Sequence, residues 1–253
     1  NSPFWEHHRN LKYSDFAMSQ PIPPSTSKSA PDGDHASHTA GDEAAISPGD
    51  PTIGYKFNHM MLRIRDPARS LHFYIDLMGM RTVFTMNTGP FTIYYLGYPQ
   101  TTEHRAGLAK FREDTVSKLP HTLGLFELYH VHGSENESEG YYSNGNQPPN
   151  LGLGHLGFSV PDVPLALERL KANGVEVVKD LGSATREDVP LSSWEAERGI
   201  GLGDLNSAYK NVFEQIAFVK DPVQLLMINC TARMDTLWSL FLKIFKGCES
   251  APG

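Results

Sequence analysis

Cysteine is scarce in this chain of 253 residues, which has only Cys230 and Cys248. Two cysteines cannot build a disulfide framework, so we interpret both as reduced thiols of an intracellular protein. The chain also lacks any apolar run of the ~18 residues that a membrane-spanning helix needs. No segment combines a basic start with an apolar centre, as a secretory signal does. These absences predict a cytoplasmic protein.

Clusters of basic residues are missing as well. Lys and Arg number 22 against 29 Asp and Glu, which gives a formal net charge of −7. A protein that binds a phosphate backbone needs a positively charged surface, so we expect no nucleic-acid partner. The apolar content of 40% is ordinary for a globular protein, and the length allows one large domain or two small ones. A small molecule is therefore the expected partner.

The two ends of the chain differ from its middle. Residues 1–51 have few core-forming side chains and many Pro, Ser, Asp and Gly, so we expect a disordered tail. Residues 232–253 predict an amphipathic C-terminal helix that packs on its own domain or on a dimer partner. Binding of this helix to a membrane surface is the less favoured alternative. The domain itself should span residues 52–231.

The domain contains one supersecondary unit twice. His59 begins an apolar strand that ends at Asp66, a helix-capping residue. His155 begins a second such strand, and Asp162 follows it at the same offset. In each copy a glycine then closes the helix and another apolar strand begins. This self-similarity indicates one unit used twice. The two modules are residues 55–132 and 150–231.

Each module closes with a strand, and the two closing strands differ in charge. The first carries Glu127, which we expect on the same face as His59. The second carries Leu226 at the equivalent position, or Ile228 if the register is shifted by two residues. Together with His155, the chain offers two histidines and one carboxylate, which predict a divalent-metal site with open coordination positions. The alternative for the second histidine is a hydrogen-bonded place in the core.

Four segments resemble the glyoxalase I branch of the vicinal-oxygen-chelate superfamily, and they occur in the family's order. They are Met61–Pro67, Phe126–His130, Tyr142–Asn146 and Gly152–Val163. The resemblance covers about residues 55–231. It implies an α+β fold of two βαβββ modules, each of which curls into half a barrel. It also implies a homodimer in which metal ligands of one subunit meet those of the other.

The resemblance also implies roles for individual residues. His59, Glu127 and His155 match three of the family's metal ligands, with Zn or Ni as the expected metal and Fe as the alternative. The fourth ligand is a glutamate thought to act as the base, and here its position reads Leu226. Arg63 matches the arginine that binds the glutamyl carboxylate of glutathione. Strand alternation puts this arginine on the face of the first histidine, although a salt bridge to a core carboxylate is an equally good interpretation.

Two connections are long. Residues 133–154 form a polar link whose glutamates we expect to be solvated. Residues 183–211 form an insertion in the second module, which we interpret as a surface excursion. The alternative is that the insertion covers the cavity and supplies the missing carboxylate. The candidates for that role are Glu195, Glu197 and Glu214, with Gln224 as a neutral candidate ligand.

Together with these residues, the resemblance implies a metal-dependent lyase/isomerase of the glyoxalase I (lactoylglutathione lyase) type. The substrate, such as a glutathione adduct, would chelate through adjacent oxygens, and a proton would move through a metal-stabilised enediolate. Glu127 is then the candidate catalytic carboxylate. Because Leu226 is not a base, we expect ordinary glyoxalase I activity to be weak or absent and the substrate to have diverged. Two alternatives are a non-haem iron oxygenase of the same superfamily and a metal-free small-molecule binding module.

Overall fold

The computed structural model describes residues 45–189, 191–205, 207–223 and 226–231. The chain divides into two compact units, and the second unit, Pro51–Gly253, contains the helices and strands given below. Most of the expected N-terminal tail, the expected C-terminal helix and Gln224 lie outside the described residues. Within the part of the chain that is described, no helix is long and apolar enough to cross a membrane.

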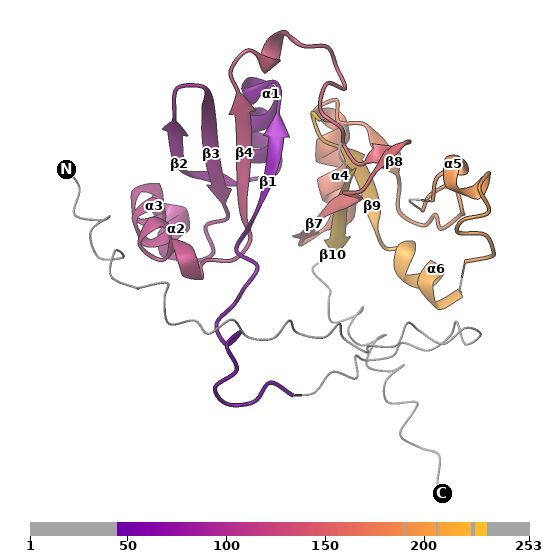
Figure 1. Ribbon diagram of the computed structural model, residues 1–253, viewed down its shortest axis with the longest axis horizontal. Helices are drawn as coiled ribbons and strands as arrows, with labels where there is room; N and C mark the ends of the chain where they lie inside the picture. The colour runs from indigo at the N-terminus through magenta and orange to yellow at the C-terminus, as the bar shows by residue number, and fades with distance from the viewer. Residues whose placement is uncertain (1–44, 190, 206, 224–225, 232–253) are drawn as a thin grey trace, which may run out of the picture. The chain divides into compact units, whose positions relative to one another are not determined.

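The first module is a four-stranded sheet with the order β1-β4-β3-β2 (Figure 1). β1 and β4 pair in parallel, whereas β4 with β3 and β3 with β2 pair antiparallel. Three short helices between β3 and β4 were not predicted from the sequence. The elements are β1 (His59–Ile64), α1 (Pro67–Leu71), the π-helix η3 (His72–Leu77), β2 (Arg81–Asn87), β3 (Phe91–Gly97), α2 (Thr102–Ala106), α3 (Leu108–Ser117), the 3-10 helix η4 (Leu119–His121) and β4 (Leu125–Val131).

The second module repeats this topology, with the strand order β7-β10-β9-β8. β7 and β10 again pair in parallel, so the prediction of an α+β fold with two βαβββ modules is confirmed. The insertion lies between β8 and β9. The elements are β7 (His155–Val160), α4 (Val163–Ala172), β8 (Val177–Lys179), α5 (Ser193–Ala196), α6 (Ser207–Phe213), β9 (Ala217–Lys220) and β10 (Leu226–Thr231). The link between the modules holds the 3-10 helix η5 (Ser134–Asn136), β5 (Asn146–Gln147) and β6 (Asn150–Leu151).

The crossover helix of each module begins with the same capping chemistry, as the sequence predicts. The Asp66 carboxylate accepts a hydrogen bond from the backbone N–H of Arg69 at 3.0 Å. The Asp162 carboxylate accepts one from the backbone N–H of Leu165 at 2.9 Å. Each bond satisfies an N–H group that has no partner inside its helix. In the first module the helix widens into a π-helix at His72, a feature that the sequence pattern did not indicate.

One face of each sheet is buried in a single apolar cluster that both modules share. Ile64 and Leu128 of the first sheet and Val219 of the second are completely buried in it. Burial of one such side chain stabilises the fold by roughly 1.5–3 kcal/mol. Successive strand residues point to opposite faces. The residues between these core positions therefore lie on the other face, which is where the candidate site residues are found.

A hydrogen bond inside this core joins the two modules. The hydroxyl of Tyr74, on η3, donates to the carboxylate of Asp221, which follows β9, at 2.5 Å. Both side chains are buried. Burial, and then the negative charge of Asp221, raises the pKa of Tyr74 well above its usual value. Arg169 of α4 adds a second link, because its guanidinium donates to the backbone carbonyl of Leu77.

Replacing Tyr74 with Phe should lower the free energy of unfolding by about 2 kcal/mol, because a buried carboxylate loses a donor. Tyr98→Phe is the matched control. The Tyr98 hydroxyl donates to the neutral carbonyl of Met78 at 2.8 Å, and its loss should cost about 1 kcal/mol. Urea unfolding measures both variants. A smaller loss for Tyr74→Phe than for the control would contradict the importance of the link between modules.

The same tyrosine predicts a dependence on pH. Its folded-state pKa lies above the value of ~10 for an unfolded chain, so the folded protein keeps a proton that the unfolded chain loses. The stability from this group is therefore fully present below about pH 10 and is lost as the pH rises further. The difference in unfolding free energy between wild type and Tyr74→Phe should stay constant up to about pH 9 and shrink above about pH 10. A difference that grows with pH would contradict this account.

Candidate functional site

His59 and Glu127 lie together on the less buried face of the first sheet. Glu127 pairs in register with Met61, two residues beyond His59 on the neighbouring strand. The Nε2 atom of His59 is 3.6 Å from the Oε2 atom of Glu127. Two ligands held about 2.1 Å from one ion lie roughly 3–3.4 Å apart, so a small movement of either side chain would let the pair share a divalent cation. The alternation of strand residues correctly predicted that the two side chains meet.

Asn58 fixes the orientation of the His59 ring. Its side-chain NH₂ donates to the carbonyls of Leu119 at 2.8 Å and Thr122 at 2.5 Å. The Asn58 Oδ1 atom is therefore the acceptor that faces the Nδ1 atom of His59, 2.8 Å away. An acceptor at this position places the ring proton on Nδ1 and leaves the lone pair on Nε2, toward Glu127. Outer hydrogen bonds of this kind orient the histidine ligands of metal ions.

Tyr95 is a neighbour of this pair that the sequence analysis missed. It lies directly across from Glu127 in the pairing of β3 with β4, close enough for the carboxylate to act on the tyrosine hydroxyl. Its ring lies 5.4 Å from the His59 ring and stacks on Phe84 at 4.7 Å. Burial, followed by the charge of Glu127, raises the pKa of Tyr95 to about 12. The tyrosine thus stays protonated beside the carboxylate.

Arg63 shares the exposed face of β1 with His59, as strand alternation predicts. Its side chain is exposed and lies over the ring of Tyr129, 5.2 Å from the ring centre. Among the described residues no carboxylate forms a salt bridge with it. The core salt bridge that we considered as the alternative is therefore absent from the described structure, and the guanidinium is open to an anionic ligand.

His155 occupies the corresponding place on the second sheet, at the start of β7. Its ring is 6.0 Å from the ring of Phe218 on β9. Desolvation by its surroundings lowers its pKa, so the imidazole favours the neutral form that a metal ligand needs. The side chain lines an open cavity of about 460 Å³. The insertion contributes to the same cavity through Val189, Leu191, Ser192 and Glu195.

The three predicted ligands do not meet within one chain. Among the described residues, no group of three His, Cys, Asp or Glu side chains is placed to hold a metal ion. The pair of His59 and Glu127 lies on the first sheet and His155 on the second. A complete site from these three residues therefore requires a second copy of the chain, as the resemblance implies.

The pairing registers correct one assignment in the closing strand. In the first module His59 pairs with Leu125, so Glu127 stands two residues farther along β4. In the second module His155 pairs with Leu226, and the equivalent of the glutamate is therefore Ile228. The assignment to Leu226 is wrong, and the register shifted by two residues holds. Either residue is aliphatic, so the absence of a carboxylate from this strand position is unchanged.

The insertion does not lie free on the surface, contrary to the expectation of a surface excursion. Val189 and Phe213 pack against Phe218 of β9 in a small separate core. The buried ammonium group of Lys179 donates to the carbonyls of Phe213 at 2.9 Å and Ile216 at 2.5 Å. Val189 lies in the insertion, and Phe213 and Ile216 follow it, so these contacts hold the segment and its C-terminal flank against the second sheet.

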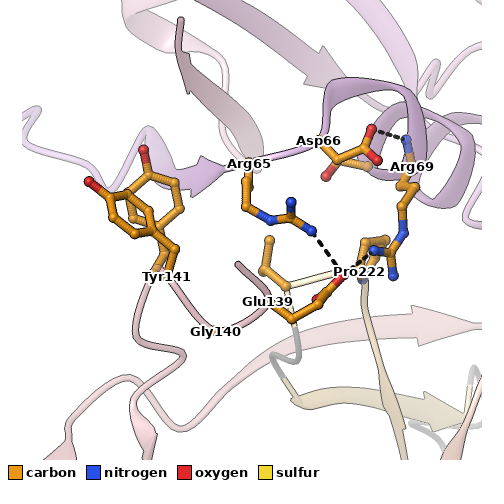
Figure 2. Close-up of a pocket in the computed structure, with 10 residues that line it drawn as sticks. Arg65, Asp66, Arg69, Glu139, Gly140, Tyr141 and Pro222 are labelled. Atoms are coloured by element: carbon orange, nitrogen blue, oxygen red, sulfur yellow. Dashed lines mark hydrogen bonds and ion pairs between the residues drawn. The ribbon is translucent and has the colours of Figure 1, made fainter. Parts of the chain in front are cut away.

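The link between the modules is also fastened, through an arginine pair. Figure 2 shows Arg65 and Arg69 converging on Glu139, with distances of 2.9 Å and 2.6 Å to the Oε1 atom. Arg65 also donates to the carbonyl of Glu137 at 2.8 Å. Glu139 is exposed, as expected of a solvated glutamate, but it also pairs with two arginines. The cavity beside these groups measures only about 20 Å³, room for little more than one water, so we assign it a structural role.

Comparisons with known proteins show the family of the chain. The model of the Glyoxalase/Bleomycin resistance protein/Dioxygenase superfamily matches residues 56–189. A lactoylglutathione lyase of Pseudomonas aeruginosa is 39% identical over 132 residues, which are 51% of this chain and 72% of that protein. A lactoylglutathione lyase of Pseudomonas putida is 36% identical over 132 residues, 51% of this chain and 73% of that protein. Glyoxalase I of Saccharomyces cerevisiae is 32% identical over 147 residues, 56% of this chain but 42% of the yeast protein.

The family match includes β1, β4, β7 and β8 and stops before β9 and β10. The unmatched part thus contains the strand in which Ile228 takes the place of a carboxylate. The matched part contains both histidines, Glu127 and Arg63. Since the match covers more than half of the 253 residues, the chain belongs to the Glyoxalase/Bleomycin resistance protein/Dioxygenase superfamily, in which it is a glyoxalase I-like member.

Proposed function

We propose that the protein is a metal-dependent lyase/isomerase of the glyoxalase I type. The observation that carries the proposal is the pairing of His59 with Glu127. Asn58 hydrogen-bonds to the Nδ1 atom of His59, which leaves the Nε2 atom toward the carboxylate. This orientation is required of a metal ligand and serves no evident purpose in an exposed structural histidine. The relatives named lactoylglutathione lyase support the class of reaction.

The proposed site is completed in a homodimer. His59 and Glu127 of one copy would hold a divalent ion together with His155 of the second copy. Two imidazoles and one carboxylate suit Zn or Ni, and they also bind Fe. When bound, the ion would supply Lewis-acid stabilisation of negative charge on adjacent substrate oxygens.

The remaining chemistry belongs to the chain itself. Glu127 is the proposed catalytic carboxylate, which takes a proton from the carbon beside a carbonyl and returns it to the neighbouring carbon. The protonated Tyr95 hydroxyl would lie beside this carboxylate. Arg63, exposed on the same face and without a carboxylate partner among the described residues, would bind an anionic group of the substrate such as a glutathione carboxylate. Because Ile228 replaces the family's second carboxylate, we propose a diverged substrate and weak turnover of the ordinary glutathione adduct.

Alanine substitution of the proposed ligands tests the function. His59→Ala and His155→Ala should each lose most of the bound metal and on the order of 100-fold or more of the activity on a 2-oxoaldehyde–glutathione adduct. His72→Ala is the matched control, because this exposed histidine pairs with Asp76 at 2.8 Å and lies outside the site. Elemental analysis and isomerisation rates provide the measurements.

The identity of the metal separates the classes of function. Zinc, nickel or cobalt in the purified protein supports the lyase/isomerase. Iron together with oxygen consumption would point instead to an oxygenase. Protein that binds no divalent metal, or His155→Ala protein that retains both metal and activity, would overturn the proposal.

Asn58→Ala tests the orientation of the first ligand. Loss of the Oδ1 acceptor should free the His59 ring to change tautomer and lower the metal affinity by about 10- to 100-fold. Nitrogen NMR of metal-free protein at alkaline pH should show the Nδ1–H form of His59 in wild type and a mixture of forms in the variant. A wild-type ring protonated on Nε2 would contradict the geometry described above.

A further inference from the structure

The second sheet offers a histidine but no strand carboxylate at the position where the first sheet offers Glu127. The register of β7 with β10 puts Ile228 there. The cavity of about 460 Å³ that His155 lines contains one acidic side chain, Glu195, which comes from the insertion. The two other glutamates that the sequence analysis considered, Glu197 and Glu214, do not line this cavity.

The insertion is held so that this carboxylate stays near the histidine. Phe218 contacts the ring of His155 at 6.0 Å between centres, and it also packs against Val189 of the insertion and against Phe213, which follows the insertion. The same aromatic residue thus supports the histidine and the segment that carries Glu195. A side chain on an anchored segment loses less freedom when it binds a ligand than one on a loose loop.

The Glu195 side chain is itself oriented by a capping box. Its Oε2 atom accepts hydrogen bonds from the hydroxyl of Ser192 at 2.8 Å and from the backbone N–H of Ser192 at 3.2 Å. The Ser192 hydroxyl in turn accepts from the backbone N–H of Glu195 at 3.2 Å. In the described structure the Oε1 atom of this carboxylate makes no hydrogen bond or ion pair. One oxygen is therefore held by the helix start, and the other is available to a ligand.

We propose that Glu195 supplies the carboxylate of the His155 half of the site, as a ligand for a divalent cation in place of the strand residue Ile228. This inference rests on the proposed metal-dependent function. The insertion would then supply the carboxylate ligand that strand β10 lacks. A second carboxylate raises the affinity of two histidines and one carboxylate for a divalent ion. The site would then comprise His59 and Glu127 of one copy with His155 and Glu195 of the other.

Calorimetric titration of metal-stripped protein with Zn²⁺ tests the proposal without reference to activity. Glu195→Gln should weaken Zn²⁺ binding by about 10- to 100-fold, because the amide keeps the capping box but carries no charge. Glu197→Gln is the matched control, since Glu197 is exposed and lies at the end of the same short helix. Its Zn²⁺ affinity should equal that of wild type.

A rescue variant completes the design. Glu195→Gln combined with Ile228→Glu places a carboxylate at the strand position and should restore most of the lost affinity. Urea unfolding of Glu195→Gln and Glu197→Gln should give the same midpoint. A lower midpoint for Glu195→Gln would identify a folding defect as the cause of its weak binding.

The outcomes separate this inference from the function on which it rests. If wild type binds Zn²⁺, His155→Ala does not, and Glu195→Gln binds as tightly as Glu197→Gln, the role of Glu195 is overturned while the proposed function stands. Weak binding by Glu195→Gln that accompanies a lowered unfolding midpoint also overturns it in favour of a structural role. If wild type binds no Zn²⁺, both proposals fall together.

Discussion

Burial of one face of each sheet in a shared apolar core is the constraint on which the rest of the structure depends. Leu128 and Val219, from different modules, are completely buried in the same cluster, and the hydrogen bond from Tyr74 to Asp221 crosses it. Because strand side chains alternate, a face fixed in the core leaves the opposite face free for polar residues. His59 and Glu127 occupy that face in the first module, and His155 occupies it in the second.

The sheet faces that point away from the core differ between the two modules. The difference is the part of the chain that brings a carboxylate near the histidine. The first sheet brings its own carboxylate, which pairs with Tyr95 across β3 and β4, to its histidine. The second sheet has an aliphatic residue at that strand position, and an anchored insertion brings Glu195 to the cavity of its histidine. The family match ends at residue 189, within the insertion. The part of the chain beyond the family match thus contains both Glu195 and Ile228.

Local patterns in the sequence were enough to predict much of this arrangement. Asp66 and Asp162 cap helices because a carboxylate at that position meets nearby backbone N–H groups. The meeting of His59 with Glu127 follows from strand alternation once the two strands are known to be neighbours. These features depend on a few consecutive residues or on a two-residue period, both of which a single sequence shows directly.

Features that depend on pairing between distant residues could not be predicted in the same way. The choice of Ile228 over Leu226 needs the register of β7 with β10. The contact of Tyr95 with Glu127 needs the register of β3 with β4. The attachment of Glu139 to Arg65 joins residues that are 74 positions apart. Helix α2 is a different case, because Thr101 caps it through the backbone N–H of His104, a local signal that the sequence analysis overlooked.

The central claim is that the site is shared between two copies of the chain, each contributing a different sheet. Mixing metal-free His59→Ala protein with His155→Ala protein, after joint unfolding and refolding, tests this claim most directly through the metal content of the mixture. If the claim holds, half of the dimers are mixed and each restores one of its two sites, so the mixture should bind about a quarter of the wild-type metal. A mixture that binds no more metal than the two variants bind separately would contradict the account.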